Sequence, residues 1–247
     1  MECGEWRKNM KLITSGCSFS LTDQNIEDHF KTWPNYLSEE LGAPLTSKAM
    51  GSQGNGLISR SIIYEVTQNL LRDIEIRVGI MWSGSDRAEV WSKEPLFENV
   101  DGWVENPTGF IPETKHWQIL NPHWMTEKSD LYYAHLHHEM YGWISSLEHI
   151  LRTQWFLEKY RIPYFMTFMK DPVFPDEDNL MYGYKELKHL RDLINWENFL
   201  PIKGMYDWCM ETDSVEKPPG FGPKADHPTT EQHEQFTREV ILPFGFK

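Results

Sequence analysis

Short apolar runs alternate with apolar positions at helical spacing along this sequence. The runs Lys11–Cys17 and Glu75–Trp82 are apolar over most of their length, which is typical of strands covered on both faces. Between them, one apolar face predicts a helix that runs to about Asp73. Its apolar residues recur every four positions, at Ile58, Ile62, Val66 and Leu70.

The same patterns predict the other elements of the chain. Pro34 in a first turn and Gly42 as a stop delimit a helix over 33–42. Further helices are expected over about 131–160, 185–197 and 229–242, and further strands over about 44–49, 161–169 and 199–202. This alternation implies an α/β protein with a mostly parallel five-stranded sheet and helices on both faces.

One long stretch shows no periodicity. Residues 93–130 are rich in Pro, Gly, Asn and Trp, and we interpret them as a loop insertion, or lid, over the active edge of the sheet. Two interpretations stay open for the tryptophans in or beside it, a lid core or a platform for sugar rings: Trp91, Trp103, Trp117 and Trp124. We expect residues 1–10 to form an N-terminal arm and 1–247 to form a single domain.

Composition narrows the class of partner. The formal net charge of −13 argues against nucleic acid and against anionic membrane surfaces, since both select clustered cations. No apolar run approaches the length of a membrane span, and the start of the chain lacks the pattern of a signal peptide. Cys3, Cys17 and Cys209 form no paired framework, which favours a reducing compartment. We expect a cytoplasmic protein, with virion association or release by lysis left open.

Candidate chemistry gathers where predicted strands end. Small-residue turns follow three of them, at Gly16-Cys17-Ser18, Gly51–Asn55 and Ser83–Asp86. Ligands of open α/β sheets bind outside those strand ends. A histidine, His227, stands just before the last predicted helix. A serine hydroxyl needs such a base to become a nucleophile.

This order of motifs resembles the SGNH/GDSL hydrolase superfamily over most of the chain. Gly16-Cys17-Ser18 looks like its Gly-Asp-Ser block, with Cys17 in place of aspartate, and Ser83–Asp86 looks like its third block without the usual asparagine. The resemblance is greatest to a divergent subgroup often encoded by bacteriophages and marine bacteria. The features that carry it are Gly16-Cys17-Ser18-Phe19, Trp33-Pro34, Asn55, the Trp82 and Arg87 pair, and His227-Pro228.

The resemblance implies a three-layer α/β/α flavodoxin-like fold and a set of site residues. Ser18 would be the nucleophile and His227 the base, with the backbone at Gly51 in the oxyanion hole. Asn55 or Ser85 would add a side-chain donor, and Arg87 would orient substrate or pair with Glu89. Lys224 stands where the family has its triad aspartate, so Asp226, Asp213 or a dyad without an acid remain as alternatives.

Simpler interpretations exist for each motif. His227-Pro228 also suits a turn before a helix capped by Thr229, and the glycines of 51–54 suit a phosphate loop, although the P-loop lysine is missing. His135, His138 and Glu139 invite a metal site, but their spacing matches no known ligand set, and we expect no metal.

The leading hypothesis is therefore a serine esterase that needs no cofactor. It would remove an acyl group, such as acetyl, from a carbohydrate or small ester. The alternative is a glycan- or partner-binding protein of the same fold, associated with a virus. The oligomeric state is left open.

Overall fold

A parallel β-sheet forms the centre of the protein. The computed structural model describes residues 10–22, 31–72, 74–91, 117–122, 127–172, 174, 184–212 and 227–247. In these residues, sheet A has four strands in the order β2-β1-β3-β6. They are β1 (Met10–Ser15), β2 (Leu45–Ser47), β3 (Glu75–Trp82) and β6 (Tyr164–Phe168).

Every pairing in this sheet is parallel, so the strands end at a common edge. The β1–β3 register runs from Met10 opposite Glu75 to Ser15 opposite Ile80. The strand order matches the first four positions of the flavodoxin-like arrangement. The predicted fold class is thereby confirmed. The strand expected at 199–202 is reduced to one parallel bridge between Met166 and Phe199.

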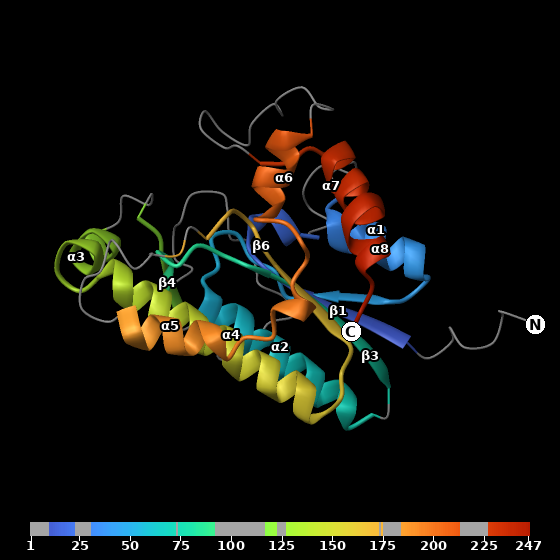
Figure 1. Ribbon diagram of the computed structural model, residues 1–247, viewed down its shortest axis with the longest axis horizontal. Helices are drawn as coiled ribbons and strands as arrows, with labels where there is room; N and C mark the ends of the chain where they lie inside the picture. The colour runs from blue at the N-terminus through green and yellow to red at the C-terminus, as the bar shows by residue number, and fades with distance from the viewer. Residues whose placement is uncertain are drawn as a thin grey trace, which may run out of the picture.

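Helices cover both faces of the sheet (Figure 1). One face carries α2 (Asn55–Leu70), α4 (Glu139–Lys159) and α5 (Tyr184–Asp192). The other carries α1 (Trp33–Leu41), α6 (Met205–Glu211) and α7 (Thr230–Phe236), which continues through a π-helical turn (Thr237–Ile241) into α8 (Leu242–Phe244). The one-turn 3-10 helices are η1 (Ser18–Ser20) and η4 (Trp196–Asn198).

Two apolar layers form because neighbouring residues of a strand point to opposite faces. Leu12 and Ile13 are both fully buried in β1. Leu12 belongs to the layer with Trp33 of α1, whereas Ile13 belongs to the layer with Ile58 of α2. This explains why the strand runs are apolar throughout rather than alternating.

The stretch interpreted as an unstructured insertion contains regular structure. β4 (Ala88–Trp91) pairs antiparallel with β5 (Trp117–Leu120), and α3 (Glu127–His135) follows. The loop prediction was therefore wrong at 117–120 and from 127 onward, because strands of four residues are too short to show a period. The part of the lid prediction that covers 93–116, including Trp103, falls outside the described residues, as do Trp124 and residues 1–9 of the predicted arm.

The single helix expected over 131–160 is two helices. α3 ends at His135, and α4 starts after His138, whose imidazole accepts a hydrogen bond from the Met140 amide at 3.2 Å. His138 is thus a helix cap, and no group of three or more potential metal ligands occurs among the described residues. No described helix is long and apolar enough to cross a membrane.

The buried sheet predicts the energetic cost of truncating its central strand. Leu12→Ala should lower the free energy of unfolding by about 2–5 kcal/mol, because it leaves a cavity between β1 and α1. Leu71→Ala removes the same atoms from a side chain that is 79% exposed. This control should change the free energy of unfolding by less than about 0.5 kcal/mol. Urea unfolding of both variants measures the difference. Equal losses would contradict this assignment of the core.

Candidate active site

Ser18 and His227 meet at the carboxyl edge of the sheet. Ser18 opens the 3-10 turn that follows β1, and His227 stands just before α7. Although 209 positions separate them in sequence, the Nε2 atom of His227 lies 2.7 Å from the Ser18 Oγ atom. This is within the range of a strong hydrogen bond, and it is the distance at which a histidine can take a proton from a hydroxyl.

The chain turns sharply into Ser18 because position 16 is glycine. A Cβ atom at Gly16 would lie 2.4 Å from the Ser20 Oγ atom and 3.1 Å from the Met81 carbonyl oxygen. Cys17 faces the core, where its thiol contacts the Met169 sulfur at 3.4 Å. Cys17 therefore packs beneath the turn, next to the end of β6.

The start of α7 holds His227 in place. Thr229 and Gln232 form a capping box, and the ring of Phe19 lies 5.0 Å from the ring of His227 between centroids. Deeper in α7, the Nδ1 atom of His233 accepts a hydrogen bond from the Trp33 amide at 3.3 Å, which joins α7 to α1. Burial lowers the pKa of His233 to about 3, and repulsion from His227 acts in the same direction.

The loop after β2 lies against the end of β1. The Met50 amide donates to the Gly16 carbonyl at 3.2 Å, and the Gln53 amide donates back to the Met50 carbonyl at 3.2 Å. Gly51 is thus held close to the turn that carries Ser18. Within the described part of the chain, the Ser18 and Gly51 amides donate to no protein acceptor.

Asn55 holds the turn after β3. Its Oδ1 atom accepts from the Ser83 amide at 2.8 Å, while its Nδ2 atom donates to the Ser83 carbonyl at 3.2 Å and to the Ser146 hydroxyl at 3.0 Å. Both amide hydrogens are therefore used inside the fold. In this arrangement Asn55 positions a loop and has no hydrogen left for an oxyanion.

The turn that contains Ser85 is pressed against α4. A Cβ atom at Gly142 would lie 2.4 Å from the Ser85 carbonyl oxygen, and the Tyr133 hydroxyl donates to the Asp86 carbonyl at 2.5 Å. The Arg87 amide donates to the Gly84 carbonyl at 3.4 Å. These contacts fix the backbone of the turn without revealing a substrate role for Ser85 or Arg87.

Glu89 pairs with Arg60 of α2 at 3.2 Å, rather than with Arg87 as one interpretation expected. Burial raises the pKa of Glu89, and the charge of Arg60 opposes that shift. The Arg60 guanidinium in turn lies 3.9 Å from the centroid of the Trp117 ring, which also meets Trp91 edge to face. Trp117 is therefore packed against protein on two sides, which favours the core interpretation for this tryptophan.

The third member of a triad is not located. Asp226, Asp213 and Lys224 all lie outside the described residues. The acid that would orient the His227 ring accordingly stays a prediction from the sequence.

Comparisons with known proteins add a family and two structural likenesses. A family model described as "Family of unknown function (DUF6071)" matches residues 21–242. No curated protein sequence matches the chain.

Two solved structures resemble the fold at low identity. A lipolytic protein assigned to the G-D-S-L family, from Desulfitobacterium hafniense, is 12% identical with a TM-score of 0.44, over 93% of this chain and 97% of that one. A catalytic mutant of an acetylxylan esterase from Geobacillus stearothermophilus is 11% identical with a TM-score of 0.45, over 97% of this chain and 95% of that one.

The buried imidazole of His233 predicts a loss of stability in acid. Its pKa is depressed in the folded state, so below about pH 6.5 the unfolded chain takes up a proton that the folded chain refuses. This group alone should lower the free energy of unfolding by up to about 1.4 kcal/mol per pH unit between about pH 6 and pH 4.

His233→Asn keeps an acceptor for the Trp33 amide but cannot titrate in this range. The variant should show a shallower decline in unfolding free energy from pH 7 to pH 4 than the parent protein, as measured by urea titrations at each pH. Parallel declines in the two proteins would show that the folded protein protonates His233 as readily as the unfolded chain does, which contradicts a lowered pKa.

Proposed function

We propose a hydrolytic activity for this chain, which belongs to DUF6071, a family of unknown function. In this proposal the protein acts as a serine esterase of the SGNH type. The observation that carries the proposal is the 2.7 Å approach of the His227 Nε2 atom to the Ser18 hydroxyl. The approach occurs where parallel α/β sheets bind their ligands, outside the carboxyl ends of the strands.

The reaction follows from these two groups. The Ser18 Oγ atom attacks the carbonyl carbon of an ester while His227 takes the hydroxyl proton. The tetrahedral intermediate then expels the alcohol, to which His227 returns the proton. Water, deprotonated by His227, attacks the acyl-serine in the same way, and the release of a carboxylic acid regenerates Ser18.

Two backbone amides are suited to the negative charge of that intermediate. The amides of Ser18 and Gly51 make no hydrogen bond within the described chain, and the contact between Met50 and Gly16 holds them on neighbouring loops. Each donor of this kind typically contributes about 2.7–4 kcal/mol to the stability of the transition state.

A groove beside β6 supports a carbohydrate as the alcohol portion of the ester. It has a volume of about 890 Å³ and combines aromatic rings, including Trp196 and Trp208, with the carboxylates of Asp171 and Asp207. Rings that stack on sugar faces and carboxylates that accept sugar hydroxyls are a common combination for such ligands. Its lining includes Thr167 and Phe168 of β6 and also Asp171, on either side of Met169, whose sulfur contacts the Cys17 thiol, whereas Ser18, Gly51 and His227 do not line it.

The same groove also favours the second candidate, a glycan-binding protein that does not turn its ligand over. The two proposals separate on chemistry at Ser18. A binding protein retains its ligand when Ser18 is replaced and forms no covalent adduct, whereas an esterase hydrolyses short acyl esters and reacts with a fluorophosphonate probe at Ser18.

Ser18→Ala should lower kcat for a short acyl ester such as p-nitrophenyl acetate by at least about 10³-fold, since no other group can form the acyl intermediate. His227→Asn should cause a similar loss. The chain offers a matched control in Ser145, whose hydroxyl lies 3.2 Å from the Nε2 atom of His149 in a second serine–histidine contact on α4. Ser145→Ala should keep full activity. Unchanged hydrolysis by the Ser18 variant would refute the proposal.

A further inference from the structure

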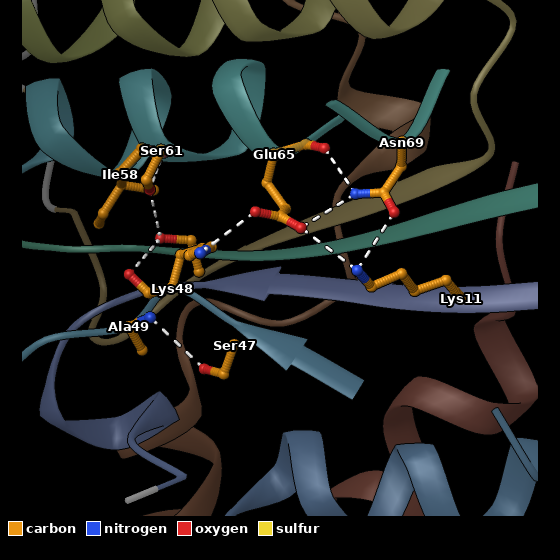
Figure 2. A network of polar contacts seen from close by, with 9 residues as sticks. Lys11, Ser47, Lys48, Ala49, Ile58, Ser61, Glu65 and Asn69 are labelled. Atoms are coloured by element: carbon orange, nitrogen blue, oxygen red, sulfur yellow. Dashed lines mark hydrogen bonds and ion pairs between the residues drawn. The ribbon is translucent and has the colours of Figure 1, made fainter. Parts of the chain in front are cut away.

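A buried ionic network links Lys48, three residues before Gly51 in the chain, to Glu65 of α2 (Figure 2). Lys48 directly follows β2, and its ammonium pairs with Glu65 of α2 at 3.1 Å. Lys11 of β1 pairs with the other oxygen of that carboxylate at 3.2 Å and also donates to Asn69 at 3.1 Å. The Lys48 side chain is only 9% exposed and that of Glu65 only 12%.

Stability alone gives little reason to keep these charges. Removing a lysine and a glutamate from water costs about as much as their attraction returns, so an apolar pair of similar volume is often as stable. Burial would raise the pKa of Glu65, but Lys48 and the hydrogen bonds from Asn69, Lys48 and Lys11 lower it overall. The carboxylate is therefore ionised at neutral pH, and the network is charged where the protein works.

The backbone of Lys48 begins the Gly51 loop and is fixed at both its polar groups. Its amide donates to the Thr14 carbonyl at 2.7 Å, and its carbonyl accepts from the Ser15 hydroxyl at 3.2 Å. The Gln53 side-chain amide reaches the same carbonyl at 3.4 Å and the Ser15 hydroxyl at 3.1 Å. Ser15 also contacts the Ser61 hydroxyl of α2 at 3.1 Å. The two ends of the loop are thus joined beneath it.

One residue between these ends adopts a strained conformation. Ser52 has φ +58°, the left-handed region that residues other than glycine rarely occupy. Such conformations persist where the surrounding contacts leave the chain no alternative, and they concentrate at functional sites. Gly51 is the residue before Ser52, so the orientation of its amide depends on how firmly 48–53 is held.

We propose that Lys48 and Gln53 are positioning residues for the oxyanion hole. The ion pair from Lys48 to Glu65 and the hydrogen bonds from Gln53 hold the loop 48–53 so that the Gly51 amide points toward the carbonyl oxygen above Ser18. Neither side chain touches the substrate. The inference rests on the proposed esterase function; it adds Lys48, which lies outside the motifs, and gives Gln53, inside the Gly51–Asn55 turn, a role that the motif did not indicate.

Lys48→Met and Lys11→Met form a matched pair of variants, because each removes one ammonium from the same Glu65 carboxylate. Lys11 lies four residues before Ser15, about 13 Å along the strand from the loop. Lys48→Met should lower kcat for p-nitrophenyl acetate at least tenfold with KM within twofold of the parent, as expected when a transition-state donor is misaligned. Lys11→Met should leave both constants within twofold.

Gln53→Leu provides a second variant if Lys48→Met does not fold, and it should show the same loss confined to kcat. Thermal denaturation distinguishes a general loss of stability, which both lysine variants can share, from the loss of kcat, which only the loop variants should show. Equal kcat values for Lys48→Met and Lys11→Met, or a Gln53→Leu enzyme with parental kcat, would overturn the inference.

The Gly51 amide gives a readout that does not need turnover. In ¹H–¹⁵N spectra of the full chain, its resonance should shift or broaden in Lys48→Met and in Gln53→Leu and stay in place in Lys11→Met. An unmoved resonance in both loop variants refutes the inference. A shifted resonance in a protein whose parent neither hydrolyses esters nor labels at Ser18 upholds the positioning and refutes the esterase proposal instead.

Discussion

The parallel pairing of β1 with β3 is the constraint on which the rest of the arrangement depends. It aligns the strands so that Gly16 and Ser83 leave the sheet at one edge, where the turns after both strands and the loop after β2 converge. The helices on the two faces of the sheet then position the other groups at this edge. The layer containing α1 and α7 brings His227 to Ser18, and the layer containing α2 fixes the loops from the other side.

The two helical layers contribute unequally to the site. On the α7 side, position depends on neutral groups: a capping box, a ring contact with Phe19, and the buried imidazole of His233. On the α2 side, the position of the loops depends on the ion pair of Glu65 and on the side-chain hydrogen bonds of Asn55. Under the proposed mechanism, a nucleophile and its base need one direct contact, whereas aiming backbone amides at a transient charge requires a loop held at several points. The proposal therefore accounts for the distribution of polar contacts.

Sequence patterns identified the long buried elements and missed short or exposed ones. β1, β3 and α2 were predictable because burial on both faces, or on one helical face, imposes a strong period. The pairing of β4 with β5 and the break between α3 and α4 were not, since a four-residue strand and a histidine cap leave no period to detect. The short helix α6 was missed for the same reason.

The sequence by itself determined the α/β class, the turn that presents Ser18 and the presence of a histidine before the last helix, because these depend on local spacing and residue type. Only the tertiary structure decided that the Asn55 side chain hydrogen-bonds the Ser83 backbone, that Glu89 pairs with Arg60, and that Lys48 lies buried against Glu65. From the sequence alone, a lysine that follows a predicted strand is expected to lie exposed on the surface. Its role depends on which distant carboxylate the folded chain brings to it, and that partner follows from packing rather than from spacing.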